Sequence, residues 1–378
     1  MDAADPLAAF RDRFVIDDDV IYLDGNSLGR LPRATPPRIA ELVAQEWGRV
    51  IGAAPGEVLV TDTTSVDLFK LLGAVLQAEP RRRVLLTEQQ NFPTDLYVAD
   101  GLTRLLASGH KVRAVPRDAL RDALDADVAV LTLTHVDFRT AEVHDMAALT
   151  AAAHDAGARV VWDLSHSCGA IPVDVSSAGV DLATGCGYKY LNGGPGAPAY
   201  LFVSRRLQEQ LGNPIQGWLG HESPFTFVSA YRPAAGIRRW MSGSPPVIGI
   251  AALEVAIEMF LEADMRRVGA KASQLTELFI RLADARLTRH GFEVASPRDA
   301  ARRGAQVSLR HPDGYAVIRA LIDHKVIGDF RTPDLCRFGF APLYTRFVDV
   351  WDAAERIVSV IESGEHRRAE YAERAFIT

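Results

Sequence analysis

The stretch Arg159-Val160-Val161-Trp162-Asp163-Leu164-Ser165-His166 is the part of the sequence that decides the fold. A short β-branched run here ends in a carboxylate, as expected of a buried strand whose last residue reaches the edge of a sheet. A mostly buried acid needs a charged or hydrogen-bonding partner. Asp163 is therefore either a capping residue or a carboxylate that pairs with a protonated ring nitrogen. His166 taken alone is more often a structural histidine.

Similar runs lie on both sides of this strand and alternate with stretches of helical spacing. The predicted strands are Val58–Val60, Val84–Leu86, Val112–Val115, Val128–Leu133, Arg159–Trp162 and Ala199–Val203. The predicted helices between them are Asp67–Gln77, Asp95–Ala107, Ala119–Leu124 and Met146–Asp155. Strands that alternate with helices indicate an α/β fold with a mostly parallel, doubly wound sheet.

The pattern changes after about residue 245, which predicts a second, smaller α+β domain. A helix is expected to begin at or just after the pair Pro245-Pro246, because the residue before a proline avoids the helical region. The elements expected here are helices at Val247–Ala263, Arg266–Ala285, Tyr315–His324 and Phe347–Glu362, and strands at Gln306–Leu309, Val326–Phe330 and Cys336–Phe340.

Composition excludes several classes of protein. The chain has 378 residues, of which 48% are hydrophobic and 24% charged, so it is neither disordered nor fibrous. Its net charge of −6 disfavours nucleic acid as the main partner. No apolar run is long enough to span a bilayer, and the first residues do not resemble a signal peptide. Its 3 cysteines are widely spaced, show no metal-ligand spacing and fit a reducing cytoplasm.

A lysine in a compact turn is the strongest candidate for chemistry. Lys189 lies in Cys186-Gly187-Tyr188-Lys189-Tyr190-Leu191-Asn192, directly before a cluster of glycines. Most lysines are solvated surface residues, but a partly desolvated lysine has a lowered pKa and becomes a Schiff-base nucleophile. Asp163 and Lys189, each following its own strand, match the needs of pyridoxal phosphate. They supply a lysine for the aldehyde and an acid for the ring nitrogen.

The segment Val60-Thr61-Asp62-Thr63-Thr64-Ser65-Val66 follows the first strand and begins a helix. Hydroxyl residues at a helix start cap free N–H groups, and the same groups bind phosphate. For this segment alone, a simple N-cap is the more common outcome. The sequence contains no GxxxxGK[ST] motif, which excludes a P-loop, and no GxGxxG after an early strand.

Along nearly its whole length the sequence resembles the kynureninase family of fold-type I pyridoxal-phosphate enzymes, nearer to the bacterial than to the animal form. The matching motifs occur in family order, at residues 22–29, 91–95, 162–167, 187–192, 217–222 and 244–246. The resemblance implies a seven-stranded, mostly parallel sheet. It also implies an N-terminal segment at residues 1–35, a large cofactor-binding domain at 36–260 and a small domain at 261–378.

The resemblance also implies a role for each matching residue. Lys189, Tyr188 and Asp163 would be catalytic, with Lys189 holding the cofactor and Tyr188 acting as a second acid or base. The cofactor-binding residues would be Thr64, Ser65, Phe92, Asp95, Thr134, Asp163, His166, Tyr188, Lys189, Trp218 and Ser244. Asn26, Ser27 and Arg337 would contact substrate, with Arg337 binding its α-carboxylate. No metal is expected.

The implied reaction is hydrolytic cleavage of L-kynurenine, or of 3-hydroxykynurenine, to L-alanine and anthranilate or its hydroxylated form. Trp218 and Ser244 would reach the phosphate of a neighbouring subunit, so a cytoplasmic homodimer with shared sites is expected. Taken singly, most of these residues have a simpler interpretation: Phe92 and Trp218 as packing aromatics, or Arg337 as a surface ion pair.

One segment departs from the family pattern. Family members carry a substantial insertion between the residues equivalent to Trp47 and Ile51, with a His or Trp that contacts the substrate's aromatic ring; here only Gly48-Arg49-Val50 fill that place. The loss of a stacking contact weakens binding by about 0.5–1.5 kcal/mol. Two alternatives therefore stay open beside a kynureninase. One is a class V aminotransferase or desulfurase-like enzyme, and the other is a weakly active or non-catalytic pyridoxal-phosphate-binding relative.

Overall fold

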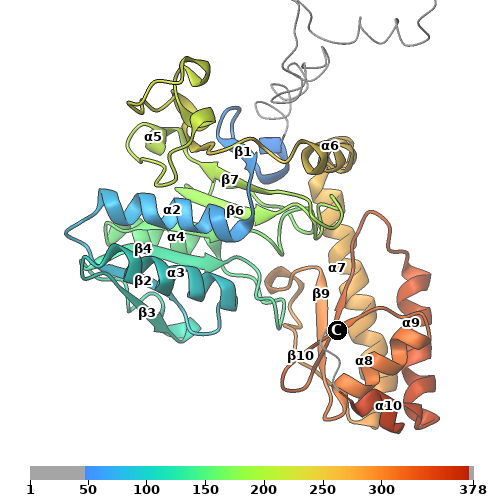
Figure 1. Cartoon of the computed structure of the whole chain (residues 1–378). Coiled ribbons are helices and arrows are strands. Elements are labelled where there is room, and N and C mark those ends of the chain that lie inside the picture. The colour runs from blue at the N-terminus through green and yellow to red at the C-terminus, as the bar shows by residue number, and fades with distance from the viewer. Residues whose placement is uncertain (1–46, 374–378) are drawn as a thin grey trace, which may run out of the picture.

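The computed structural model describes residues 47–373, which form two sheets and the helices around them (Figure 1). The large sheet has seven strands in the order β1-β7-β6-β5-β4-β2-β3. These strands are β1 (Val58–Thr61), β2 (Val84–Glu88), β3 (Lys111–Val115), β4 (Val128–Thr134), β5 (Arg159–Asp163), β6 (Leu182–Cys186) and β7 (Ala199–Val203). The predicted α/β architecture with a mostly parallel seven-stranded sheet is confirmed.

The directions of the strands place the carboxyl ends of most of them at the same edge of the sheet. Strands β6, β5, β4, β2 and β3 are parallel neighbours. Strand β7 runs antiparallel to both β6 and β1, so β1 points the same way as β6. The carboxyl ends of β1, β2, β4, β5 and β6 therefore meet at one edge of the sheet, which is where ligands bind in open α/β folds.

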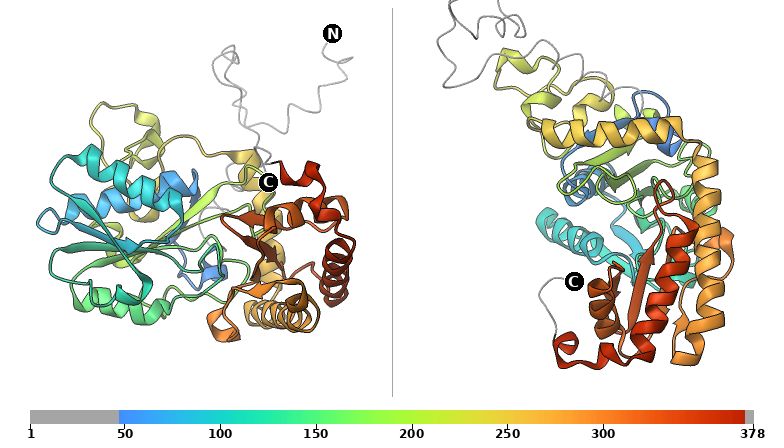
Figure 2. Two further views of the ribbon diagram at one scale, coloured as in Figure 1. Left: turned by 90° about the horizontal axis from the view of Figure 1, so that it is seen from below. Right: turned by 90° about the vertical axis from the view of Figure 1, so that its right-hand side faces the viewer.

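Helices cover both faces of the large sheet, and all its strands except the edge strand β3 are largely buried (Figure 2). Helices α2 (Thr64–Ala78) and α3 (Pro93–Leu106) share a core with Leu85 of β2. Helices α4 (Met146–Asp155) and α6 (Val247–Glu262) share the opposite core with Val84 and Leu86 of the same strand. This alternation along β2 is the period-2 pattern of a strand.

The second sheet has four strands in the order β10-β11-β9-β8. They are β8 (Glu293–Val294), β9 (Gln306–Arg310), β10 (Asp329–Arg331) and β11 (Leu335–Gly339), and they pack with α7 (Met265–Leu282), α8 (Gly314–Asp323), α9 (Phe347–Glu362) and α10 (Ala369–Ala372). This unit has a core of its own, which runs from Leu275 to Tyr371. The predicted domain limits after residues 35 and 260 stay predictions.

Short helical pieces complete the described part of the chain. They are α5 (Arg205–Gln208), a π-helical turn η8 (Ala283–Leu287), and the 3₁₀ turns η3 (Trp47–Ile51), η4 (Arg117–Ala119), η5 (Trp218–Gly220), η6 (Pro224–Thr226), η7 (Gly236–Trp240), η9 (Thr288–His290), η10 (Ala300–Arg302) and η11 (Glu365–Arg367). None of the helices between residues 47 and 373 has the length and apolar character needed to cross a membrane.

Two sequence predictions differ from the structure, and one strand was not predicted. The helix predicted at Ala119–Leu124 is wrong: η4 ends at Ala119 and turns follow, because a stretch this short gains too few hydrogen bonds to offset helix nucleation. The strand predicted at Val326–Phe330 is shifted, since β10 begins at Asp329. Strand β6, with the sequence LATGC, has no apolar run to mark it and forms because β5 and β7 flank it.

Candidate active site

The candidate site lies at the edge where the strand carboxyl ends meet. Asp163 is the last residue of β5, and Lys189 lies in the turn that follows β6. This turn is tight: a Cβ atom added to Gly187 would collide with Leu253 and with the carbonyl oxygen of Pro198. The absence of a side chain at Gly187 thus lets the backbone pack closely and fixes the direction in which the turn presents Lys189.

Asp163 is held rigidly at the strand end. Its Oδ1 accepts hydrogen bonds from the backbone N–H of Ser165 at 2.8 Å and from the Ser165 hydroxyl at 2.5 Å. Burial raises the pKa of this carboxyl, whereas the charge of Lys189 and the bonds from Ser165 act to lower it. No residue described in the structure donates to Oδ2, so this oxygen remains able to accept a further N–H.

Lys189 contacts two of the predicted cofactor residues. Its Nζ lies 2.8 Å from Nε2 of His166 and 5.6 Å from the centre of the Phe92 ring. Burial, followed by the positive charge of Lys189, holds the pKa of His166 well below its usual value. His166 is therefore a neutral imidazole that accepts from the lysine, and its buried Nδ1 has no partner among the described residues.

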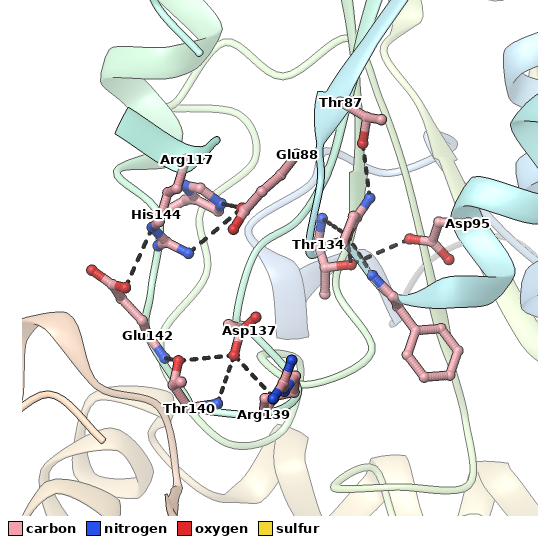
Figure 3. Close-up of polar contacts among 12 residues, drawn as sticks. Thr87, Glu88, Asp95, Arg117, Thr134, Asp137, Arg139, Thr140, Glu142 and His144 are labelled. Carbon is pink, nitrogen blue, oxygen red and sulfur yellow. Dashed lines mark hydrogen bonds and ion pairs between the residues drawn. The ribbon is translucent and has the colours of Figure 1, made fainter. Parts of the chain in front are cut away.

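A second polar group surrounds Thr134, the last residue of β4 (Figure 3). Oδ1 of Asn91 accepts from the Thr134 N–H at 3.1 Å, from the Thr134 hydroxyl at 2.5 Å and from the Phe92 N–H at 2.9 Å. The Asp95 carboxyl lies 3.2 Å from the same hydroxyl, and its other oxygen is buried with no partner in the described chain. Burial and the nearby charge of Asp163 raise the pKa of Asp95.

The start of helix α2 supplies free N–H groups after β1. Thr63 is the N-cap residue, and Thr64 and Ser65 form the first turn, partly exposed. Because β1 and β6 point the same way, this turn lies at the same edge of the sheet as Lys189. An anion bound there would meet the backbone N–H groups and the positive end of the helix dipole.

A cavity of about 450 Å³ opens beside these residues, between the two sheets. Lys189 and His166 line it from the large sheet, and Arg337 of β11 lines it from the small one. The Arg337 side chain is 11% exposed and is ion-paired with Asp329 of β10. The simpler interpretation of Arg337 as an ion-paired residue is borne out, but the pair lines the cavity instead of lying on the outer surface.

The remaining predicted residues lie elsewhere or outside the described range. Trp218 and Ser244 are exposed and do not line the cavity. Tyr188 is next to Lys189 in the turn and half exposed, and burial raises the pKa of its phenol to about 12. Asn26 and Ser27 fall in residues 1–46, outside the described part of the chain. The cofactor and substrate roles assigned to all these residues stay predictions.

Several residues that shape the site were not predicted from the sequence. Asn91 links the ends of β2 and β4, and a polar residue directly before Phe92-Pro93 was a possible signal for it. Asp329 and Arg331 line the cavity beside Arg337. Their position depends on the pairing of β10 with β11, which local sequence does not reveal.

Solved structures with this fold define the class. A cysteine desulfurase from Thermococcus onnurineus superposes with a TM-score of 0.74 at 17% identity, covering 95% of this chain and 92% of that one. A cysteine desulfurase from Escherichia coli gives 0.71 at 20% identity, covering 94% and 98%. A variant of the lyase C-DES, solved with glycine linked to its pyridoxal-phosphate cofactor, gives 0.75 at 18%, covering 88% and 89%. The fold is that of the fold-type I pyridoxal-phosphate enzymes.

Sequence comparison then identifies the family. The kynureninase of Pseudomonas fluorescens is 44% identical, with 100% of this chain and 98% of the relative aligned. That of Burkholderia pseudomallei is 43% identical over the same shares. Residues 268–357 match the family model "Kynureninase C-terminal domain". The chain belongs to the kynureninase family. Both alignments extend over 407 positions against 378 residues here, so these relatives carry segments that this chain lacks.

Proposed function

We propose that this protein cleaves L-kynurenine hydrolytically to anthranilate and L-alanine, using pyridoxal phosphate bound at Lys189. The observation that carries the proposal is the shared cavity of Lys189 and Arg337. An α-amino acid bound there would place its amine near the lysine and its carboxylate near the guanidinium. Cleavage of 3-hydroxykynurenine belongs to the same proposal.

The residues present fit the cofactor. Asp163 has an oxygen free to accept from a protonated ring nitrogen, and the bonds from Ser165 fix the carboxyl in place. The first turn of α2 offers N–H groups and two hydroxyl residues to a phosphate. His166 and Asp95 each present a buried polar atom without a partner in the described structure. These atoms are costly to bury unless a ligand satisfies them.

When bound, pyridoxal phosphate supplies an electron sink for the breaking of bonds at the substrate's α- and β-carbons. The protein supplies orientation and proton transfer. Asp163 would hold the ring nitrogen protonated, Phe92 would stack on the ring, and Thr64 and Ser65 would bind the phosphate. Lys189 would take and return the proton at Cα, with neutral His166 as its hydrogen-bond acceptor.

Tyr188 would serve as the second acid. Its phenol keeps its proton at neutral pH, as an ordinary tyrosine does, and burial raises its pKa further, to about 12. The turn that carries Lys189 also carries this phenol, so both groups reach the same edge of the sheet. A protonated phenol at this place can donate to the substrate carbonyl or to the carbon that becomes the alanine methyl group.

We also propose that the working unit is a cytoplasmic homodimer. Trp218 and Ser244 are exposed and lie outside the cavity of their own chain, which supports a role at a neighbouring subunit. Large apolar side chains nearby in the sequence are also exposed, including Ile248 at 89%. All 3 cysteines are free and buried, which suits a reducing compartment.

The desulfurase alternative needs a reactive, mobile cysteine. Cys168, Cys186 and Cys336 are all buried, and burial raises the pKa of Cys168 and of Cys336 to about 12. A thiol with such a pKa is a poor nucleophile at neutral pH. This observation favours carbon–carbon cleavage over sulfur transfer.

The test is an anthranilate fluorescence assay with purified protein, pyridoxal phosphate and L-kynurenine, run beside Lys189→Ala. Turnover by the parent and none by the variant supports the proposal. A parent that forms the cofactor adduct but releases no anthranilate would contradict the proposed substrate. Equal rates in both proteins would refute the role of Lys189.

A further inference from the structure

Three charged side chains of the small sheet gather in the cavity. Asp329 of β10 and Arg337 of β11 are direct cross-strand partners, and Arg331 follows on the same face of β10. Nε of Arg337 donates to Oδ1 of Asp329 at 2.6 Å, and its Nη2 bonds Oδ2 of the same carboxylate. Nη2 of Arg331 lies 3.1 Å from Oδ2 of Asp329. Two cations thus share one anion, and the group carries a net positive charge.

The Asp329 carboxylate binds the side of the Arg337 guanidinium that carries Nε and Nη2. An arginine has five N–H donors, and Asp329 takes those of Nε and one of Nη2. Nη1 donates to the carbonyl oxygen of Phe138, in the loop that follows β4. Two N–H groups remain, one on each terminal nitrogen. Both lie on the terminal nitrogens, from which a guanidinium can donate to a second carboxylate.

The anchoring of Arg337 extends across both sheets to Phe92, the residue proposed to stack on the cofactor. The carbonyl of Phe138 also accepts from Nε2 of Gln306 on β9, at 3.0 Å. The ring of Phe138 packs edge-on against Phe92, with centroids 5.2 Å apart. Arg337 is therefore fixed by its own sheet through Asp329, and by the large sheet through the residue that supports Phe92.

We propose that Asp329 is a positioning residue that holds Arg337 side-on, so that its remaining N–H donors meet the substrate's α-carboxylate. The inference rests on the proposed role of Arg337. Arg331 pairs with the same carboxylate, and this second cation keeps Asp329 from repelling an anionic substrate. Replacement of Asp329 has two opposing effects. It makes the cavity more positive, and it frees the guanidinium to turn. We expect the second effect to be the larger one, because the remaining donors meet a bound carboxylate in only one orientation of the guanidinium.

The experiment compares two ligands that differ only in the carboxylate. L-Alanine and L-alaninamide are titrated into the cofactor-loaded parent, Asp329→Asn and Arg337→Gln, and binding is followed by the change in cofactor absorbance. We expect Asp329→Asn to weaken L-alanine roughly ten-fold, as the loss of a charge-assisted contact does, and to leave L-alaninamide unchanged. With L-kynurenine, KM should rise by a similar factor while kcat stays close to that of the parent.

Two further variants serve as controls. Asp329→Glu keeps the carboxylate and should bind L-alanine more tightly than Asp329→Asn. Asp334→Asn makes the same change in the same hairpin, at a residue that pairs with Arg310 outside the cavity, and should match the parent. Thermal unfolding of each loaded protein checks that the fold is kept. If Asp329→Asn does not fold, the test is whether Asp329→Glu, whose longer side chain shifts the guanidinium, weakens L-alanine relative to the parent and leaves L-alaninamide unchanged; equal binding of L-alanine by both proteins would overturn the inference.

Each other result overturns part of the proposal. If L-alanine binds Asp329→Asn as well as the parent or more tightly, Asp329 does not position Arg337. If both ligands weaken equally, Asp329 acts through general structure. If Arg337→Gln weakens L-alanine but Asp329→Asn does not, only this inference fails. If Arg337→Gln leaves L-alanine binding unchanged, the proposed role of Arg337 fails, and this inference fails with it.

Discussion

Burial sets the charge of the histidines beside the site. His135 follows β4 and packs edge-on against Trp162, and burial lowers its pKa to about 3. An unfolded histidine titrates near pH 6.5. Between these values the unfolded chain binds the extra proton, so the free energy of unfolding rises with pH through this window and is lost as the pH falls below about 6.5.

The pH dependence can be tested at this residue. Between pH 7.5 and pH 5, His135 should cost the folded protein about 2 kcal/mol of unfolding free energy. His135→Gln removes the titrating group, so its urea midpoint should fall less over the same pH range than that of the parent. Identical pH slopes in the two proteins would show that His135 is not buried as a neutral ring.

Among single residues, the sequence predicted those whose side-chain type differs from that of their neighbours. It missed the residues whose role depends on which strands pair in the sheet. Asp163 and Lys189 each follow a strand and differ in type from their neighbours, so they could be found. Asn91 and Asp329 resemble ordinary turn and edge residues. Their function depends on which strand ends meet, and that information is held by the whole sheet.

Among the helices and strands, the N-terminus of α2 is where we expect the phosphate of the cofactor to bind. Ser65→Ala removes a hydroxyl from the proposed phosphate site and should weaken pyridoxal phosphate binding roughly ten-fold, the effect of losing a hydrogen bond to a charged group. The measurement is the cofactor dissociation constant. Asp145→Ala removes a cap from α4, where Oδ1 accepts from the Ala148 N–H at 2.9 Å. This control should cost about 1 kcal/mol of stability and leave cofactor affinity unchanged.

Two glycines make a matched pair for the same substitution. Gly101 lies in α3, and an added Cβ there would have no neighbouring atom within 4 Å, so Gly101→Ala should raise the free energy of unfolding by about 0.5–1 kcal/mol. Gly187→Ala forces Leu253 and the Pro198 carbonyl to move and should lower both stability and cofactor content. Urea unfolding and absorbance measure the two effects. A Gly187→Ala protein that matches the parent would contradict the tight turn.

Helices and strands could be predicted from the sequence where a local signal, such as a proline pair, sets their ends. Helix α6 begins at Val247, directly after Pro246, as the proline pair predicts. The wrongly predicted helix and the strand that was not predicted have the opposite cause. The stretch Ala119–Leu124 has helical spacing but too few residues to form a helix, and β6 has little strand propensity but two neighbours that complete its hydrogen bonds.

For the whole molecule, the proposed dimer gives a direct expectation. Ile248→Asp places a charge on a side chain that is 89% exposed in the single chain and should shift the protein toward monomer, because a buried unpaired charge is costly at an interface. The shift should also weaken cofactor retention if Trp218 and Ser244 serve the neighbouring site. Tyr97 on α3 is 71% exposed, and Tyr97→Asp is the matched control. Light scattering that finds both variants equally dimeric would exclude Ile248 from the interface.

Two sheets with separate cores meet at one cavity, and the proposed function depends on a covalent bond formed there. The most direct measurement is mass spectrometry of the protein incubated with pyridoxal phosphate, reduced with borohydride and digested. We expect the adduct on the peptide that contains Lys189, and its loss in Lys189→Ala. An adduct confined to other lysines, or none with the cofactor in excess, would contradict the proposed function.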